Sequence, residues 1–220
     1  MAYYIDAESI SLADLRKRIE ATDLVPSRVA LLHQLRTKVK ALERYGITTL
    51  AQLRHELKNT RRLEAVAQAT GIDVPYLVLL RREIEGYFPK PFALQDFKWL
   101  PPKEIARLEQ HGLHDTLALY EAARNAQKKA RLAAATGVDS AALEALTRLA
   151  DLTRIQWVNP TTARLLAAVA YDSAAKVAAA NAKDLYEALR RVNEGNRFFK
   201  GTIGLRDVKR LVQAAGYLAC

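Results

Sequence analysis

The fold is decided by the stretch Arg154-Ile-Gln-Trp-Val-Asn-Pro-Thr-Thr-Ala-Arg164. One helical pattern, over residues 143–153, leads into this stretch, and a second one leaves it. Pro160 suits the first position of the second helix, because its ring fixes φ and no N–H is needed there. The stretch therefore predicts two helices joined by a tight hairpin. Such a hairpin points the free backbone N–H groups of a helix N-terminus outward, which suits a phosphate.

The chain has 220 residues, enough for one large domain or two small ones, and 50% of them are hydrophobic, so a core can form. Lys and Arg number 34 against 24 Asp and Glu, which gives a net charge of +10. This charge favours a polyanionic partner such as DNA, RNA or an anionic membrane. A solvated basic surface explains the charge equally well.

The sequence contains no apolar run of about 18 residues, so we expect no membrane-spanning helix and no membrane partner. Residues 1–6 show neither the basic nor the apolar region of a signal peptide. The single cysteine, Cys220, cannot form a disulfide within the chain, which gives no support to secretion. The cytoplasm is the expected location.

Helical patterns fill the first part of the chain after an extended arm over residues 1–10. Ser11 caps a helix of roughly residues 12–21, and Pro26 opens a longer helix of roughly residues 26–45 with one apolar stripe. Three more helices follow, which end near Leu57, at Thr70 and near Glu85; their limits are indicated by Gly46, Thr48 or Thr49, Gly71 and Asp73.

The segment Gly86-Tyr-Phe-Pro-Lys-Pro91 cannot continue a helix, because each proline lacks a donor and restricts the residue before it. It predicts a boundary between an N-terminal half, residues 1–88, and a C-terminal half, residues 89–220. Helical patterns resume near Pro102 and continue to a final helix over residues 205–216. No convincing strand pair is found, so the predicted fold class is all-α.

The sequence repeats itself at a spacing of 66 residues, which relates residues 42–82 to residues 108–148. Helix-ending glycines and helix-starting aspartates recur at matching positions, namely Gly46 with Gly112, Gly71 with Gly137, and Asp73 with Asp139. The matching positions therefore specify helix ends and core contacts rather than a ligand site. We expect both stretches to form the same helical unit, with a third, partial copy at Ala170-Tyr-Asp-Ser173.

The run from Ile155 to Ser173 resembles the pattern I-x-G-V-G-x-x-x-A-x-x-L-x-x-A-G-x-D-[ST] of helix-hairpin-helix domains, which occur in DNA-repair proteins, ligases and nuclease subunits. There a glycine-flanked hairpin presents backbone amides to DNA phosphates without reading sequence. More closely, nearly the whole chain is similar to an uncharacterised bacterial and archaeal family of helix-hairpin-helix-like domains of unknown function. The segments that carry this similarity are Tyr3-Tyr4-Ile5, Leu24-Val-Pro26-Ser27-Arg28, Leu80-Arg81-Arg82-Glu83-Ile84, Tyr87-Phe-Pro89-Lys90-Pro91, Asp151-Leu-Thr-Arg154-Ile-Gln-Trp157-Val158 and Lys200-Gly201-x-Ile203-Gly204-Leu205. The resemblance implies tandem helix-hairpin-helix-like (SAM-like) units in two related halves, and it brings no established activity.

The first hairpin departs from that pattern, because Trp157 and Asn159 stand where glycines are usual and Val169 replaces a third glycine. Asn accepts a positive φ fairly well, whereas Trp does not. We therefore expect Trp157 to be an anchor in the core or at an interface rather than a platform for a base. The candidate phosphate contacts of this hairpin are Arg154, Asn159, Thr161 and Arg164. Ordinary exposed surface residues are the alternative.

The segment from Phe198 to Arg206 predicts a second hairpin, whose glycines would bring backbone close to an anion. Residues 191–210 hold six basic residues against two acidic ones, a net charge of +4, and the helix that follows adds its positive N-terminal end. The candidate nucleic-acid-binding residues here are Lys200, Gly201, Thr202, Gly204, Arg206 and Lys209. A glycine turn before a solvated basic helix is the alternative. Residues 36–62 form a further basic zone, with a net charge of +6, which a solvated helix surface explains equally well.

Catalytic and metal-binding patterns are weak. His111 and His114 flank the helix-breaking Gly112 without further ligands, so we expect no metal and no cofactor. The predicted function is non-catalytic, sequence-independent binding of the DNA or RNA phosphate backbone. The alternative is a scaffold for a protein partner or a homo-oligomer. Basic residues gathered on the hairpin face favour the first function, and an exposed apolar patch there favours the second.

Overall fold

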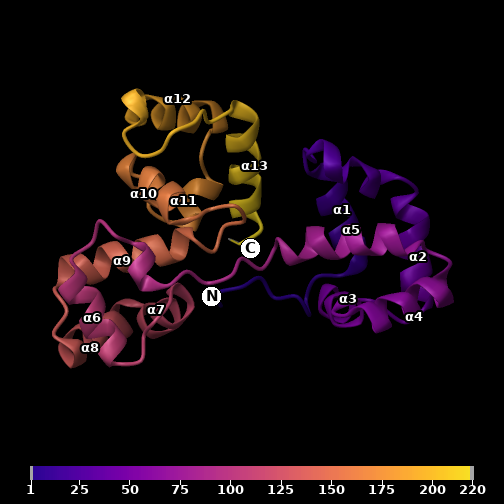
Figure 1. Ribbon diagram of the computed structural model, residues 1–220, viewed down its shortest axis with the longest axis horizontal. Coiled ribbons are helices and arrows are strands. Elements are labelled where there is room, and N and C mark those ends of the chain that lie inside the picture. Colours follow the sequence, from indigo (N-terminus) through magenta and orange to yellow (C-terminus); the bar gives the residue numbers. More distant parts are fainter. Residues whose placement is uncertain (1, 219–220) are drawn as a thin grey trace. The chain divides into compact units, whose positions relative to one another are not determined.

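A computed structural model describes residues 2–218, which form helices joined by loops (Figure 1). No β-strand occurs in this described part of the chain, where Ser11 with Thr49 and Ala93 with Asp115 form isolated bridges. The all-α prediction is therefore confirmed. The chain divides into two compact units: an N-terminal unit of residues 5–88, and a C-terminal unit made of the residues up to Tyr4 and those from Pro89 onward. Cys220 lies outside the described residues.

The N-terminal unit is built of short helices whose ends follow the capping signals in the sequence. Its elements are α1 (Leu12–Ala21), η1 (Pro26–Leu32), α2 (Leu35–Arg44), α3 (Leu50–Leu57), α4 (Thr60–Thr70) and α5 (Val74–Glu85). Ser11 accepts a hydrogen bond from the backbone N–H of Asp14, and Asp73 accepts one from that of Tyr76. Each side chain thereby satisfies a donor that the helix itself leaves free, which contributes about 1 kcal/mol.

The single helix predicted over residues 26–45 is wrong, because the chain forms η1 and α2 with a left-handed residue, Gln34, at φ 53° between them. The Tyr76 hydroxyl donates to the Leu31 carbonyl at 2.8 Å, so this carbonyl is bound from outside the helix. Burial raises the pKa of Tyr76 to about 12, which keeps the hydroxyl protonated for this role.

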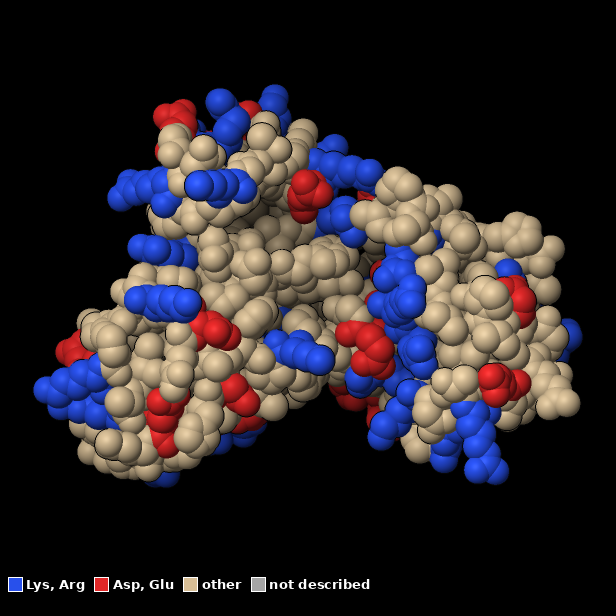
Figure 2. Space-filling view, viewed as in Figure 1, with Lys and Arg blue, Asp and Glu red and all other residues tan. Residues whose placement is uncertain are grey.

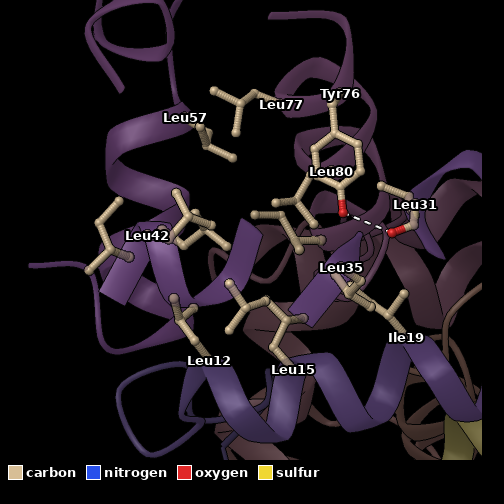
Figure 3. Packing of buried hydrophobic residues seen from close by; sticks show 14 of the residues in the cluster. Leu12, Leu15, Ile19, Leu31, Leu35, Leu42, Leu57, Tyr76, Leu77 and Leu80 are labelled. Atoms are coloured by element: carbon tan, nitrogen blue, oxygen red, sulfur yellow. Dashed lines mark hydrogen bonds between the residues drawn. The ribbon is translucent and has the colours of Figure 1, made fainter. Parts of the chain in front are cut away.

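Leucines dominate the core of this unit. Figure 3 shows Leu12, Leu15 and Ile19 of α1 directed toward the same interior as Leu42, Leu57, Leu77 and Leu80 from the other helices. Burying a side chain of this kind stabilises the fold by about 1.5–3 kcal/mol. The apolar stripes of the helices therefore fix their packing.

The C-terminal unit continues the same style of construction. Its elements are η2 (Leu94–Asp96), α6 (Pro102–Gln110), α7 (Thr116–Ala123), α8 (Ala126–Thr136), α9 (Ser140–Leu152), α10 (Pro160–Ala168), α11 (Ala174–Ala178), α12 (Ala182–Val192), η3 (Glu194–Asn196) and α13 (Leu205–Gly216). In Figure 1, α6 to α9 form one group of helices and α10 to α13 a second group, which α9 and α10 join.

The first described residues belong to the C-terminal unit and not to the N-terminal half in which we predicted them. Tyr3 is buried, and its ring lies edge-on to Tyr120, with 5.6 Å between the ring centroids. Its backbone N–H donates to Glu121, and its hydroxyl is 2.9 Å from the Thr116 hydroxyl. These contacts with α7 hold the arm in the C-terminal unit, although the residues that follow it in the sequence belong to the N-terminal unit. Burial of the Tyr3 ring stabilises this placement.

The internal repeat is visible in the helix bounds and in the hydrogen bonds. Helices α3 and α7, and likewise α4 and α8, begin and end 66 residues apart. Asn59 and Asn125 cap the second pair, and Gly71 and Gly137 end it in left-handed backbone, at φ 70° and 64°. Residues 42–82 and 108–148 therefore share one helix order.

The partial third copy uses the same turn without glycine. The N–H of Leu113 donates to the Leu108 carbonyl, and at the matching place the N–H of Tyr171 donates to the Leu166 carbonyl. Ala170 takes the glycine position at φ 64°. Ser173 then caps α11. The turn geometry is thus repeated three times, although only the first two copies use the residue best suited to it.

Candidate nucleic-acid interface

The hairpin between α9 and α10 forms as predicted, with Trp157 in a conformation that usually needs glycine. Trp157 has φ 71°, and its neighbours Ile155 and Val158 are buried beneath it. The Trp157 side chain is 47% exposed, so it is not an anchor in the core, and its role as an anchor at an interface stays a prediction. A left-handed non-glycine residue costs about 1–2 kcal/mol, and the buried neighbours impose this conformation.

Arg154 is not available to a phosphate, which corrects its assignment as a candidate contact. It is 4% exposed. Its Nε donates to the Tyr3 carbonyl at 2.8 Å and its Nη2 to the Ala2 carbonyl at 3.1 Å. Its Nη1 donates to the Tyr120 hydroxyl and the Asp151 carboxylate. The guanidinium group therefore fixes the N-terminal arm, and all of its nitrogens are occupied.

Asn159 and Thr161 lie at the start of α10, and Arg164 lies one turn further on. The Asn159 side chain accepts hydrogen bonds from the N–H of Thr162 at 2.9 Å and from its hydroxyl at 3.2 Å. Asn159 is therefore a helix cap in this structure, and Thr161 is only half-buried beside it. Arg164 is exposed, with its guanidinium 4.9 Å from the ring centre of Trp99 and 5.3 Å from that of Phe198.

The second predicted hairpin is a loop closed by Asn193. Its side-chain oxygen accepts from the N–H groups of Phe198 and Phe199, at 3.0 and 3.2 Å. Gly201 has φ 150°, and a Cβ there would lie 3.1 Å from the Phe199 ring. Gly204 caps α13 and donates its N–H to the Asp207 carboxylate.

These contacts change the role of the two glycines. The missing Cβ of Gly201 makes room for Phe199, and the start of α13 already holds the negative charge of Asp207. Neither glycine opens the backbone to a phosphate, so any anion contact of this loop depends on its side chains. Lys200, Thr202, Arg206 and Lys209 are exposed and remain candidates.

The structure brings the two hairpins together on one surface, which we call the C-terminal basic surface: α10, the loop 197–204 and the start of α13. Arg164 of the first hairpin lies against Phe198 of the second, and Arg210 of α13 lies over Trp157, with its guanidinium 4.2 Å from the ring centre. Residues 160–168 and 197–210, which make up this surface, contain six Lys and Arg against one Asp and no Glu. In Figure 2 the part of the C-terminal unit around α10, α12 and α13 shows more Lys and Arg than Asp and Glu among largely uncharged residues.

The sequence did not single out Trp99, against which Arg164 of this surface lies, and Arg197 and Arg210 entered the prediction only through the net charge of residues 191–210. Arg197 lies 5.8 Å from the ring centre of Phe198, on which Arg164 also lies. Arg210 follows Arg206 by one helical turn, a spacing that indicates a shared helix face. Trp99 carried no signal, because it lies in an irregular segment far from the hairpins in sequence.

In the basic zone of residues 36–62, three of the five arginines are paired with carboxylates, and Arg44 and Arg61 form no ion pair in the described part of the chain. The pairs are Arg36 with Glu20 at 3.2 Å, Arg54 with Glu85 at 3.0 Å, and Arg62 with Glu56 at 3.1 Å. Arg164, Arg197 and Arg210 form no ion pair with any carboxylate among residues 2–218. Arg164, Arg197 and Arg210 therefore lack the carboxylate partners that Arg36, Arg54 and Arg62 have.

Among the described residues, no group of three or more His, Cys, Asp or Glu could hold a metal ion. His111 bonds with its Nδ1 to the Arg107 carbonyl at the end of α6. In the same part of the chain no helix is long and apolar enough to span a membrane.

The fold and the surface together define an all-helical protein with a repeated helix order and a basic surface of two joined hairpins. The chain belongs to the family described as Domain of unknown function (DUF4332), which matches residues 100–218. This match covers α6 to α13 and so includes the hairpins, which confirms the resemblance to an uncharacterised family for that part of the chain. No curated protein and no solved structure matches the chain.

Proposed function

We propose that this protein binds the phosphate backbone of DNA or RNA, without reading sequence and without catalysis, through the C-terminal basic surface. Tandem helix-hairpin-helix-like units are the architecture that we infer for this role. The repeated turns at Gly46, Gly112 and Ala170 support it, because each places a left-handed residue before a capped helix.

One observation carries the proposal: Arg164 and Arg197 both lie on the ring of Phe198 and have no carboxylate partner in the described structure. Contact with an aromatic ring restrains a guanidinium group, and the N–H donors that point away from the ring stay free. Fixed guanidinium groups bind phosphate oxygens through paired hydrogen bonds at a small entropic cost. Lys200 and Lys209 add exposed charges on the same loop and helix.

A salt titration tests the proposal. Fluorescence anisotropy with labelled duplex DNA, single-stranded DNA and RNA gives the slope of log K against log[salt]. We expect binding at low salt that is independent of sequence and weakens steeply as salt rises. No affinity for any of the three probes at low salt would overturn the proposal.

The second candidate function is a scaffold for a protein partner or a second copy of the chain. Val29 and Leu32 of η1 are 51% and 45% exposed, which is unusual for apolar side chains on neighbouring turns. Trp157 adds an exposed ring on the C-terminal unit. Light scattering of the purified protein tests this function, because a scaffold of identical copies shows a mass that rises with concentration and falls in the Val29→Ser, Leu32→Ser variant.

A further inference from the structure

A cavity of about 270 Å³ opens beside Trp157 in the C-terminal unit. Trp157, Thr162 and Leu165 line it from the first hairpin and α10, while Leu189 of α12 contributes to its apolar lining. The other walls come from the loop and α13 and include Phe199, Thr202, Ile203, Asp207 and Arg210. Its size lies just below the roughly 300–1,000 Å³ of pockets for drug-sized ligands, so it suits one ring system.

Two features of the lining suit an occupant of the cavity. The Trp157 side chain is almost half exposed, although its ring is large and apolar. The Nε of Arg210 is buried and has no hydrogen-bond partner. A buried donor without a partner costs about 1–3 kcal/mol, and such a donor in a native structure calls for an explanation. A ligand with an acceptor atom supplies one.

The lining offers donors, acceptors and an aromatic wall together. The Arg210 guanidinium donates, and it lies against Trp157 as a flat layer onto which a planar ring can stack. Asp207 uses one carboxylate oxygen on Gly204, which leaves its other oxygen to accept from an amino or imino group. Leu165, Leu189 and Phe199 supply an apolar contact. A planar ring with both donors and acceptors on its edge fits this set, and a plain anion or an aliphatic chain does not.

We propose that this cavity receives the base of one unpaired nucleotide, while the phosphates on either side meet the exposed cations of the loop. The inference rests on the proposed function and adds that the ligand has an unstacked base, at a strand end or in a single strand. Base-paired nucleotides in the middle of a duplex cannot enter, because their rings are stacked on both faces. Aromatic stacking of this kind tolerates any base, which agrees with binding that does not read sequence.

The test compares a blunt DNA duplex with the same duplex carrying a 3′ single-stranded overhang, at equal salt. Wild-type protein is expected to bind the overhang about tenfold more tightly, since stacking of one base contributes an effect of this order. Trp157→Gly removes the ring and suits the positive φ, so this variant should fold. Ile203→Phe fills the cavity from the loop. Both variants should bring this ratio close to one, and because the ratio compares two probes bound by the same variant, it does not depend on that variant's affinity for the blunt duplex.

Tryptophan fluorescence adds an independent readout, because the chain has two tryptophans and Trp99→Phe leaves Trp157 alone. The overhang should quench this signal and the blunt duplex should not. Salt-dependent binding with equal affinity for both probes would overturn the base cavity and leave the proposed function standing. Quenching by free nucleoside monophosphate without binding of any strand would keep the nucleotide chemistry of the cavity and overturn the proposed function. No response to strand or monophosphate would overturn both.

Discussion

Residues 36–62 and residues 191–210 both carry excess positive charge, +6 and +4, yet the structure engages it in different ways. In the first region Arg36, Arg54 and Arg62 pair with carboxylates of neighbouring helices. In the second, Arg197 and Arg210 lie near aromatic rings and have no carboxylate partner among the described residues, whereas Arg54 of the first has both the Glu85 carboxylate and the Phe88 ring. A paired arginine has much of its attraction for a phosphate satisfied already. The net charge of a segment therefore does not locate a binding surface. The contacts of each basic side chain are needed as well.

The contrast is sharpest inside one hairpin, where Arg154 and Arg164 had the same predicted role. Arg154 is buried among the Tyr3 carbonyl, Tyr120 and Asp151, and Arg164 is exposed on Trp99 and Phe198. We expect Arg154→Ala to lower the free energy of unfolding by about 3–5 kcal/mol, because it leaves buried acceptors and a carboxylate without their partner. Chemical denaturation measures this loss, and Arg164→Ala is the control, with a change within about 0.5 kcal/mol. Equal effects of the two substitutions would refute the contrast.

The exposed cations next to the loop should matter for binding and not for folding. We expect Lys200→Ala with Arg206→Ala to weaken binding to all sequences alike. The slope of log K against log[salt] should flatten by about 0.9 for each duplex phosphate that the variant no longer binds. The melting temperature should stay unchanged, since both side chains are exposed. If this variant keeps the wild-type slope of log K against log[salt], the loop does not contact phosphates.

Two turns of the C-terminal unit place different residues in the same left-handed backbone conformation. Gly112 and Trp157 both have a positive φ, 79° and 71°. Because Trp157 is half exposed, we expect Trp157→Ala to cost about 1 kcal/mol, well below the roughly 3–5 kcal/mol of a core tryptophan. Trp157→Gly should be more stable than Trp157→Ala by about 1 kcal/mol, since glycine has no penalty in left-handed backbone. Thermal unfolding of both variants measures this difference. Gly112→Ala is the opposite change, because it adds a Cβ in left-handed backbone, and it should lower the melting temperature.

A small effect is expected from the paired charges around α9. The hydrogen bond from Lys129, and then that from Arg148, hold the pKa of Glu144 below its ordinary value of 4.5. The hydrogen bond from Lys176 likewise lowers the pKa of Asp172 below 3.8. A carboxylate whose pKa is lower in the folded state stabilises the protein above its unfolded pKa, and this contribution is lost as pH falls through the folded value.

The protein should therefore lose stability below about pH 4.5, and Glu144→Gln with Asp172→Asn should lose less over that range. Melting temperatures between pH 7 and pH 3 measure this difference. Substitutions at Arg164 and Arg197, which have no carboxylate partner among the described residues, should leave the pH dependence as it is in the wild type.

Local signals in the sequence predicted the helix ends well. Ser11, Asp73 and Asp139 cap helices, and Gly71 and Gly137 end them, because each of these positions depends on neighbours only a few residues away. The 66-residue repeat was visible for the same reason. The break within residues 26–45 was not predicted, since it depends on Tyr76, which lies far along the chain from Leu31.

The candidate site was predicted only in outline for a similar reason. The hairpin before α10 and the loop before α13 both lie where the sequence predicted hairpins, but their contact through Arg164 and Phe198 is a tertiary one. Arg154 was misassigned because Tyr3, whose carbonyl it binds, lies 151 residues away. Gly201 was read as an opening for a ligand, although its role is to accommodate Phe199 two residues earlier. Sequence patterns supply the residue types of a surface, and packing decides which of them remain free.

The central claim is that stacked, unpaired arginines bind phosphate and paired ones do not. It is tested most directly by salt titrations of duplex DNA binding with two variants of equal charge change. Arg164→Ala with Arg197→Ala removes two stacked guanidinium groups, and Arg36→Ala with Arg62→Ala removes two paired ones. We expect the slope of log K against log[salt] to be flatter by about 1.8 in the first variant and unchanged in the second. Equal slopes in the two variants would contradict it.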